Sequence, residues 1–183
     1  MTTTVTSASD SDGTVFEVCK QSQSNTCGPA SIFMYECLVR QASMKGGEDR
    51  IIRISNYFDG NAASDAAGTD SENALSTLRH IGARVREIDE PGEDFLGLPK
   101  FTRIKPGRIA YDRPALVLVG WYDKYIHLKR SGGHYVVAAR FTNGGKVAFL
   151  DPFIGNVVEC VNDAKYSPRY GGYGRIEMVV YSG

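Results

Sequence analysis

A polar loop that runs into an apolar helix places one cysteine where it could act as a nucleophile. The segment reads Gln21-Ser22-Gln23-Ser24-Asn25-Thr26-Cys27-Gly28-Pro29-Ala30-Ser31. Asn25 and Thr26 are residue types that accept hydrogen bonds from the first turn of a helix, and Pro29 is tolerated there because that turn does not need its N–H group. Cys27 is therefore predicted at the positive end of a helix, which favours the nucleophilic thiolate. The alternative is an inert, buried packing residue.

A thiol nucleophile needs a base, and His134 is the best candidate among the three histidines of the chain. It follows Ser131-Gly132-Gly133 and opens an apolar strand, so its ring can point across to a helix end. His127 is flanked by bulky residues. His80 falls near the end of a predicted helix, where a histidine commonly interacts with the negative helix terminus. The alternative for His134 is a surface histidine at a turn.

A base of this kind needs an orienting group on its second ring nitrogen, and Asp151 is well placed for that role. The segment Thr142-Asn143-Gly144-Gly145 predicts a hairpin turn. His134 and Asp151 would then lie side by side at the open ends of the two strands. The alternative for Asp151 is a purely structural role in an Asp-Pro turn.

Attack on a carbonyl group creates an oxyanion, which fixed hydrogen-bond donors stabilise. The backbone N–H of Cys27 is one candidate donor. The side-chain amide of Gln21, six residues earlier, is the other, and Gln23 competes with it. The alternative for Gln21 is a solvated loop residue. Gly28, Gly133 and Trp121 are the candidate substrate contacts, since glycine permits close approach of a substrate backbone and an aromatic residue can form the wall of a cleft.

Helices are expected first in the chain and strands second, which indicates an α+β domain with helices packed on an antiparallel sheet. Apolar periodicity predicts helices over residues 27–43, 48–58 and 71–81. Strands are predicted over residues 15–18, 83–88, 115–121, 134–141, 146–150 and 175–181. Residues 1–14 are rich in Thr, Ser, Asp and Gly and are expected to be disordered. Residues 15–183 are expected to form one catalytic domain.

The composition of the 183-residue chain is that of an ordinary globular protein, with 42% hydrophobic residues and a formal net charge of zero. Nothing in it favours binding to nucleic acid or to an anionic membrane. The longest apolar run, residues 114–122, is too short to span a bilayer, and no secretory signal is recognised. The four cysteines lack metal-site spacing, so we expect reduced thiols, no metal, no cofactor and a cytoplasmic location.

The residues named above resemble those of papain-like cysteine peptidases. Gln21, Asn25-Thr26-Cys27-Gly28-Pro29-Ala30-Ser31, Gly132–Val137 and Asp151-Pro152 carry the resemblance, which is closest to the C39 family of bacteriocin-processing peptidases that cut leader peptides after a double glycine. The resemblance covers residues 15–181 and implies a papain-like fold with Cys27 as nucleophile, His134 as base, Asp151 as orienting residue and Gln21 as oxyanion donor. C39 domains usually precede an ABC exporter, and these 183 residues contain neither a membrane segment nor an ATPase segment of the kind an exporter would need.

The resemblance implies a peptide or protein substrate that is cleaved through a thioester intermediate. The same triad could instead catalyse acyl transfer or deamidation, for example in a bacterial effector or toxin that leaves the cell without a signal peptide. A third possibility is a non-catalytic peptide-binding module on a papain-like scaffold. The oligomeric state is not predicted.

Overall fold

The computed structural model describes residues 4–44, 46–59, 69–94, 100–122, 130–168 and 173–183. Within these residues the chain forms three helices and nine strands. The helices are α1 (Cys27–Arg40), α2 (Glu48–Asp59) and α3 (Ser71–His80). The strands are β1 (Thr4–Ser9), β2 (Val15–Lys20), β3 (Val85–Asp89), β4 (Ala115–Tyr122), β5 (Arg130–Phe141), β6 (Lys146–Asp151), β7 (Asn156–Val161), β8 (Lys165–Tyr166) and β9 (Tyr173–Ser182).

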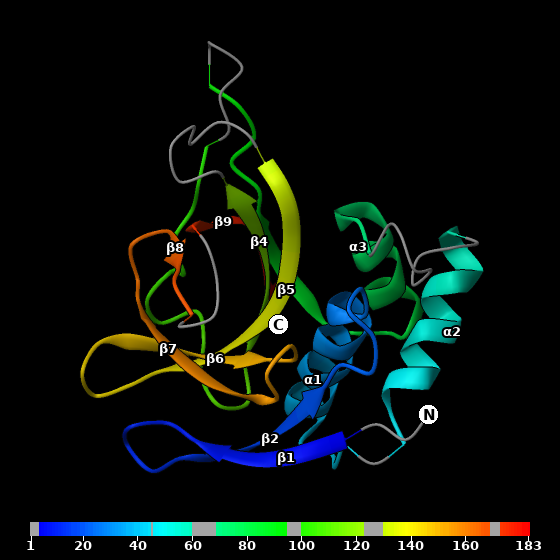
Figure 1. The fold of residues 1–183 in the computed structure, drawn as a ribbon, viewed down its shortest axis with the longest axis horizontal. Helices are drawn as coiled ribbons and strands as arrows, with labels where there is room; N and C mark the ends of the chain where they lie inside the picture. The colour runs from blue at the N-terminus through cyan, green and yellow to red at the C-terminus, as the bar shows by residue number, and fades with distance from the viewer. Residues whose placement is uncertain (1–3, 45, 60–68, 95–99, 123–129, 169–172) are drawn as a thin grey trace.

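The strands after the helices form a curled antiparallel sheet in the order β3-β9-β4-β5-β6-β7, and β8 pairs with β9 at one side. Figure 1 shows the three helices on one side of this sheet, with α1 between the sheet and the other two helices. The expected α+β class, with helices packed on an antiparallel sheet, is therefore confirmed.

The sheet has a hydrophobic core on each face, because side chains alternate between the two faces along a strand. Leu116 on β4 and Val137 on β5 belong to the core shared with α1. Their neighbours Val117 and Val136 belong to the core on the opposite face, which includes Ile104. The prediction that residues 115–121 form a strand buried on both faces is confirmed.

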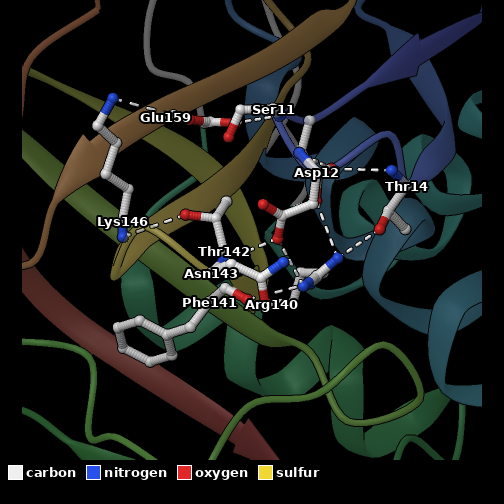
Figure 2. A network of polar contacts seen from close by, with 10 residues as sticks. Ser11, Asp12, Thr14, Arg140, Phe141, Thr142, Asn143, Lys146 and Glu159 are labelled. Atoms are coloured by element: carbon white, nitrogen blue, oxygen red, sulfur yellow. Dashed lines mark hydrogen bonds and ion pairs between the residues drawn. The ribbon is translucent and has the colours of Figure 1, made fainter.

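The expectation that residues 1–14 are disordered is wrong for residues 4–14. Thr4–Ser9 pair along their whole length with β2 to form a separate hairpin. The turn of this hairpin is held by Arg140, whose guanidinium contacts Asp10 at 3.3 Å and Asp12 at 2.9 Å and donates to the Thr14 hydroxyl. Figure 2 shows this network between the hairpin turn and the β5–β6 turn. The polar composition of residues 1–14 indicated disorder. Composition does not reveal Arg140, the residue that orders this segment, because it lies 130 residues after Asp10 in the chain.

The β1–β2 hairpin also supports the turn that follows β6. The Thr6 hydroxyl donates to the Gly155 carbonyl at 2.5 Å. The backbone N–H of Gln21 donates to the Pro152 carbonyl at 2.8 Å. Because Asp151 ends β6, the bond from Gln21 to Pro152 joins the cysteine loop and the aspartate turn through the backbone.

Helix α1 ends at Arg40, three residues before the predicted end at residue 43. Gln41 takes a left-handed conformation with φ of 51°, and its N–H and that of Ala42 bond back to the last turn of the helix. Glycine is the usual residue in this left-handed position, so a glutamine there gives no sequence signal that the helix ends. The sequence also missed β1, β7 and the two-residue strand β8.

Candidate active site

Cys27 is the first residue of α1, as the sequence predicted. Thr26 occupies the N-cap position, but its side chain makes no capping bond. Its hydroxyl instead donates to the Gln23 carbonyl at 3.0 Å and accepts from the Gln23 N–H at 3.2 Å. The predicted capping role of Thr26 is therefore wrong. The consequence is favourable for chemistry, since no Thr26 oxygen covers the positive end of α1 next to the thiol.

Glu48, at the start of α2, places a buried carboxylate against the cysteine loop. Glu48 is fully buried and accepts from the Ser22 N–H at 3.1 Å. Interaction with Thr26 further stabilises the ionised form of Glu48. Burial raises the pKa of Glu48, bonds from Thr26 and Ser22 oppose that rise, and repulsion by Asp49 adds to it.

Glu48→Gln is expected to raise the melting temperature at pH 7 and to lose this effect at about pH 4. The raised pKa means that the folded protein holds the Glu48 proton more tightly than the unfolded chain does. The ionised carboxylate therefore lowers stability once the pH rises above the ordinary glutamate pKa, and glutamine removes that charge. Thermal melts at both pH values would measure the effect, with Glu72→Gln in the exposed first turn of α3 as control. A lower melting temperature at pH 7 would contradict the expectation.

His134 lies on β5, is only 5% exposed and stands opposite Val119 on β4. Its Nε2 lies 2.9 Å from Oδ1 of Asp151. Cys27 interacts with the His134 ring closely enough to raise the pKa of the histidine. Because Nε2 is taken by Asp151, Nδ1 is the ring nitrogen left for the thiol. The structure thus brings together Cys27, His134 and Asp151, which lie on α1, β5 and β6.

The surroundings of His134 favour the imidazolium form. Burial by itself would lower the pKa of His134, but hydrogen bonds and charge interactions with Asp151 and Cys27 outweigh burial and raise that pKa to about 9. The Trp121 ring stacks on the imidazole at 6.0 Å and 19°. An imidazolium between a thiolate and a carboxylate is the arrangement that an acyl-transfer nucleophile needs.

Asp151 is fully buried, and the predicted hairpin that positions it is confirmed. The Thr142 N–H donates to the Lys146 carbonyl at 2.8 Å, and β5 and β6 pair from this turn to Val137 and Leu150. Oδ1 of Asp151 accepts from His134 and, at 2.8 Å, from the Phe153 N–H. The aspartate therefore serves the turn and the histidine at once, so the two roles that the sequence left open are compatible.

Gln21 belongs to the same loop, and its side-chain amide donates to the Gln23 carbonyl at 2.6 Å. A primary amide carries two N–H groups, so this bond orients the amide and leaves the second N–H for a ligand. The Gln21 Oε1 atom is buried and has no hydrogen-bond partner among the described residues. Gln23, the competing candidate, supplies the backbone carbonyl that holds Gln21.

A cleft of about 650 Å³ opens beside Cys27. Gly133, Leu118 and Tyr135 of the sheet form part of its wall. The remaining described lining is mostly polar or charged: Ser24, Asn25, Thr69, Asp70, Ser71, Glu90, Gly92, Glu93, Lys100, Arg130 and Glu177. Arg130 is paired with Glu177 through bonds of 2.9 and 3.0 Å. Charged and polar side chains are more numerous in this cleft than in a typical small-molecule pocket, which is lined mainly by apolar residues.

The three candidate substrate contacts have different surroundings. Gly133 lines the cleft. Gly28 is buried, and a Cβ there would lie 2.5 Å from Thr69 Cβ. Thr69 therefore occupies the space beside Gly28 in which we expected a substrate backbone. Trp121 covers the His134 ring and is not among the described residues of the cleft wall.

Two residues at the site were missed from the sequence. Glu48 follows Gly46-Gly47 and looks like an ordinary acidic residue in a first helical turn. Tyr166, one of several tyrosines late in the chain, is fully buried and donates to Oδ2 of Asp151. No local pattern identifies either residue, because each partner is distant along the chain. The competing base candidate His127 lies outside the described residues, and His80 is exposed at the end of α3.

Within the described residues, no group of three or more His, Cys, Asp or Glu could hold a metal ion. No described helix has the length and apolar character that crossing a membrane requires. Comparison of the chain with protein-family models gives no match, and comparison with curated proteins gives none either.

Proposed function

We propose that this protein is a papain-like cysteine peptidase that cleaves a peptide bond through Cys27, His134 and Asp151. The observation that carries the proposal is the connected series of side chains Cys27–His134–Asp151, placed at the start of a helix and beside a polar cleft. A helix that packs on an antiparallel sheet, with base and carboxylate on neighbouring strands, supports the papain-like assignment. The proposal includes the peptidase activity, a peptide or protein substrate and the papain-like fold family.

In the proposed first step the Cys27 thiolate attacks the carbonyl carbon of the scissile bond. The developing oxyanion accepts from the Cys27 backbone N–H and from the free N–H of the Gln21 amide. The bond that Gln21 makes to Gln23 fixes the amide before the substrate arrives. Such preorganised donors are typically worth about 100-fold or more in kcat.

His134 then moves the proton that each half-reaction needs. The imidazolium gives its proton to the leaving amine, the carbon–nitrogen bond breaks, and a Cys27 thioester remains. Neutral His134 next takes a proton from water, which attacks the thioester and releases the acid and the Cys27 thiolate. Asp151 keeps the ring oriented throughout, because its bond to Nε2 leaves Nδ1 facing the thiol.

A pool of unlabelled peptides of mixed sequence, analysed by mass spectrometry, tests the proposal. We expect cleavage by the wild type, no cleavage by Cys27→Ala, and a mass adduct on Cys27 when the reaction is quenched in acid. Ammonia release without backbone cleavage would instead establish deamidation, and transfer to an added amine would establish acyl transfer. Peptide binding without any thioester in the wild type would contradict the proposal.

A further inference from the structure

The side of Asp151 that faces away from His134 is occupied by Tyr166, a residue that the reaction scheme above does not use. Tyr166 ends β8, is fully buried, and donates its hydroxyl proton to Oδ2 of Asp151. Oδ1 of the same carboxylate accepts from His134 Nε2 at 2.9 Å and from the Phe153 N–H at 2.8 Å. Both oxygens of a fully buried carboxylate therefore have donors.

The Tyr166 ring is held firmly in this position. It packs edge-on against Phe149 at 5.2 Å and lies 6.2 Å from each of the Trp121 and His134 rings. Its strand pairs with β9 at Gly174, where a Cβ would lie 2.5 Å from the Tyr166 carbonyl oxygen. The absence of a side chain at Gly174 allows β8 to come this close, and so fixes the direction of the phenol.

Removal of a carboxylate from water disfavours its ionised form, whereas hydrogen bonds to that form favour it. Among the described residues, His134 on β5 and Tyr166 on β8 bind the carboxylate through their side chains. Asp151 also raises the pKa of the Cys160 thiol on β7 through charge repulsion, and Cys27 on α1 interacts with the histidine. Of these, only His134 brings a positive charge, and it does so only when protonated. The Tyr166 hydroxyl supports the carboxylate in both protonation states of the histidine.

We propose that Tyr166 is a positioning residue of this site, whose hydroxyl keeps Asp151 ionised and directed at Nε2 of His134. This role rests on the function proposed above, and it acts through Asp151 without contact with the reacting atoms. A tyrosine that merely filled space beside Trp121 and Phe149 would do so equally well without its hydroxyl. Tyr166→Phe separates the two roles because it removes one oxygen and keeps the ring.

The test is an NMR titration of the His134 imidazole in the full chain, in a Cys27→Ala background that removes the thiol. We expect Tyr166→Phe to raise the titration midpoint of His134 by about one pH unit, because a carboxylate that has lost this donor depends more on the charge of the imidazolium. Tyr181→Phe is the matched control. Tyr181 is also fully buried in the same core, but its hydroxyl accepts from the Lys105 N–H at 2.9 Å, so His134 should titrate unchanged.

The outcomes separate this role from the peptidase itself. A raised His134 midpoint supports the positioning role even if no peptide is cleaved, and an unchanged or lowered midpoint in folded Tyr166→Phe overturns it even if peptides are cleaved. If Tyr166→Phe does not fold, the Tyr166 hydroxyl proton is observed in the Tyr166-containing Cys27→Ala protein. Its chemical shift should then follow the His134 titration, and a hydroxyl proton that does not respond would overturn the role.

Discussion

His134→Ala is expected to slow the alkylation of Cys27 by iodoacetamide at pH 6.5 by about 100-fold, because an ordinary thiol is only about 1% thiolate at that pH. In the proposed mechanism the His134 imidazolium, whose pKa Asp151 and Cys27 raise, pairs with the Cys27 thiolate. Intact-mass spectrometry measures the rate as a function of pH. The exposed His80→Ala variant at the end of α3 is the control and should react like the wild type.

The adduct should form at a single site. Burial raises the pKa of Cys19 and of Cys37 to about 12 and also raises the pKa of Cys160. These three thiols therefore stay protonated and covered while Cys27 reacts. If wild type and His134→Ala react equally slowly, with the profile of a free thiol, the activated pair does not exist and the peptide-binding module becomes the better explanation.

The same pair sets an upper limit on the pH range of peptide cleavage. Because the pKa of His134 is raised to about 9, the imidazolium that protonates the leaving amine is present below that pH and is lost above it. We expect kcat/KM for a cleaved peptide to fall as the pH rises through about 9. A fall centred near 6.5 would show that Asp151 and Cys27 do not stabilise the imidazolium.

Arg140→Ala is expected to lower the free energy of unfolding by ~3 kcal/mol, because it leaves a buried carboxylate without its cation. The Asp10 side chain is 0% exposed and lies 3.3 Å from the Arg140 guanidinium, which also binds Asp12 and Thr14. Urea denaturation measures the loss. Proteolysis should then cut first within residues 4–14, because this network docks the β1–β2 hairpin (Figure 2).

Lys146→Ala is the matched control in the same network. The Lys146 side chain is 51% exposed and its Nζ lies 3.9 Å from Glu159 Oε2, so its loss should cost less than about 0.5 kcal/mol. Asp10→Asn in the Arg140→Ala background should recover part of the lost stability, since the unpaired charge is then absent. Equal losses for Arg140→Ala and Lys146→Ala would contradict the role of the buried pair.

Local sequence signals were sufficient for most of the elements that carry the site. The start of α1 at Cys27, the Thr142–Gly145 turn and the buried run of β4 depend on residues close together in the chain, and all three are confirmed. The predicted hairpin also implied that His134 and Asp151 are neighbours, because a short turn places residues at the open ends of its two strands side by side. Their roles in catalysis remain predictions.

Long-range contacts decided the rest, and no local pattern encodes them. Arg140 orders the hairpin that composition predicted to be disordered, Glu48 holds the cysteine loop, and Tyr166 completes the hydrogen bonds of Asp151. The sequence by itself therefore determined which residues could do chemistry and which short elements carry them, since caps, turns and periodicity act over a few residues. Only the tertiary structure decided what surrounds those residues, because burial and partners come from segments that meet when the chain folds.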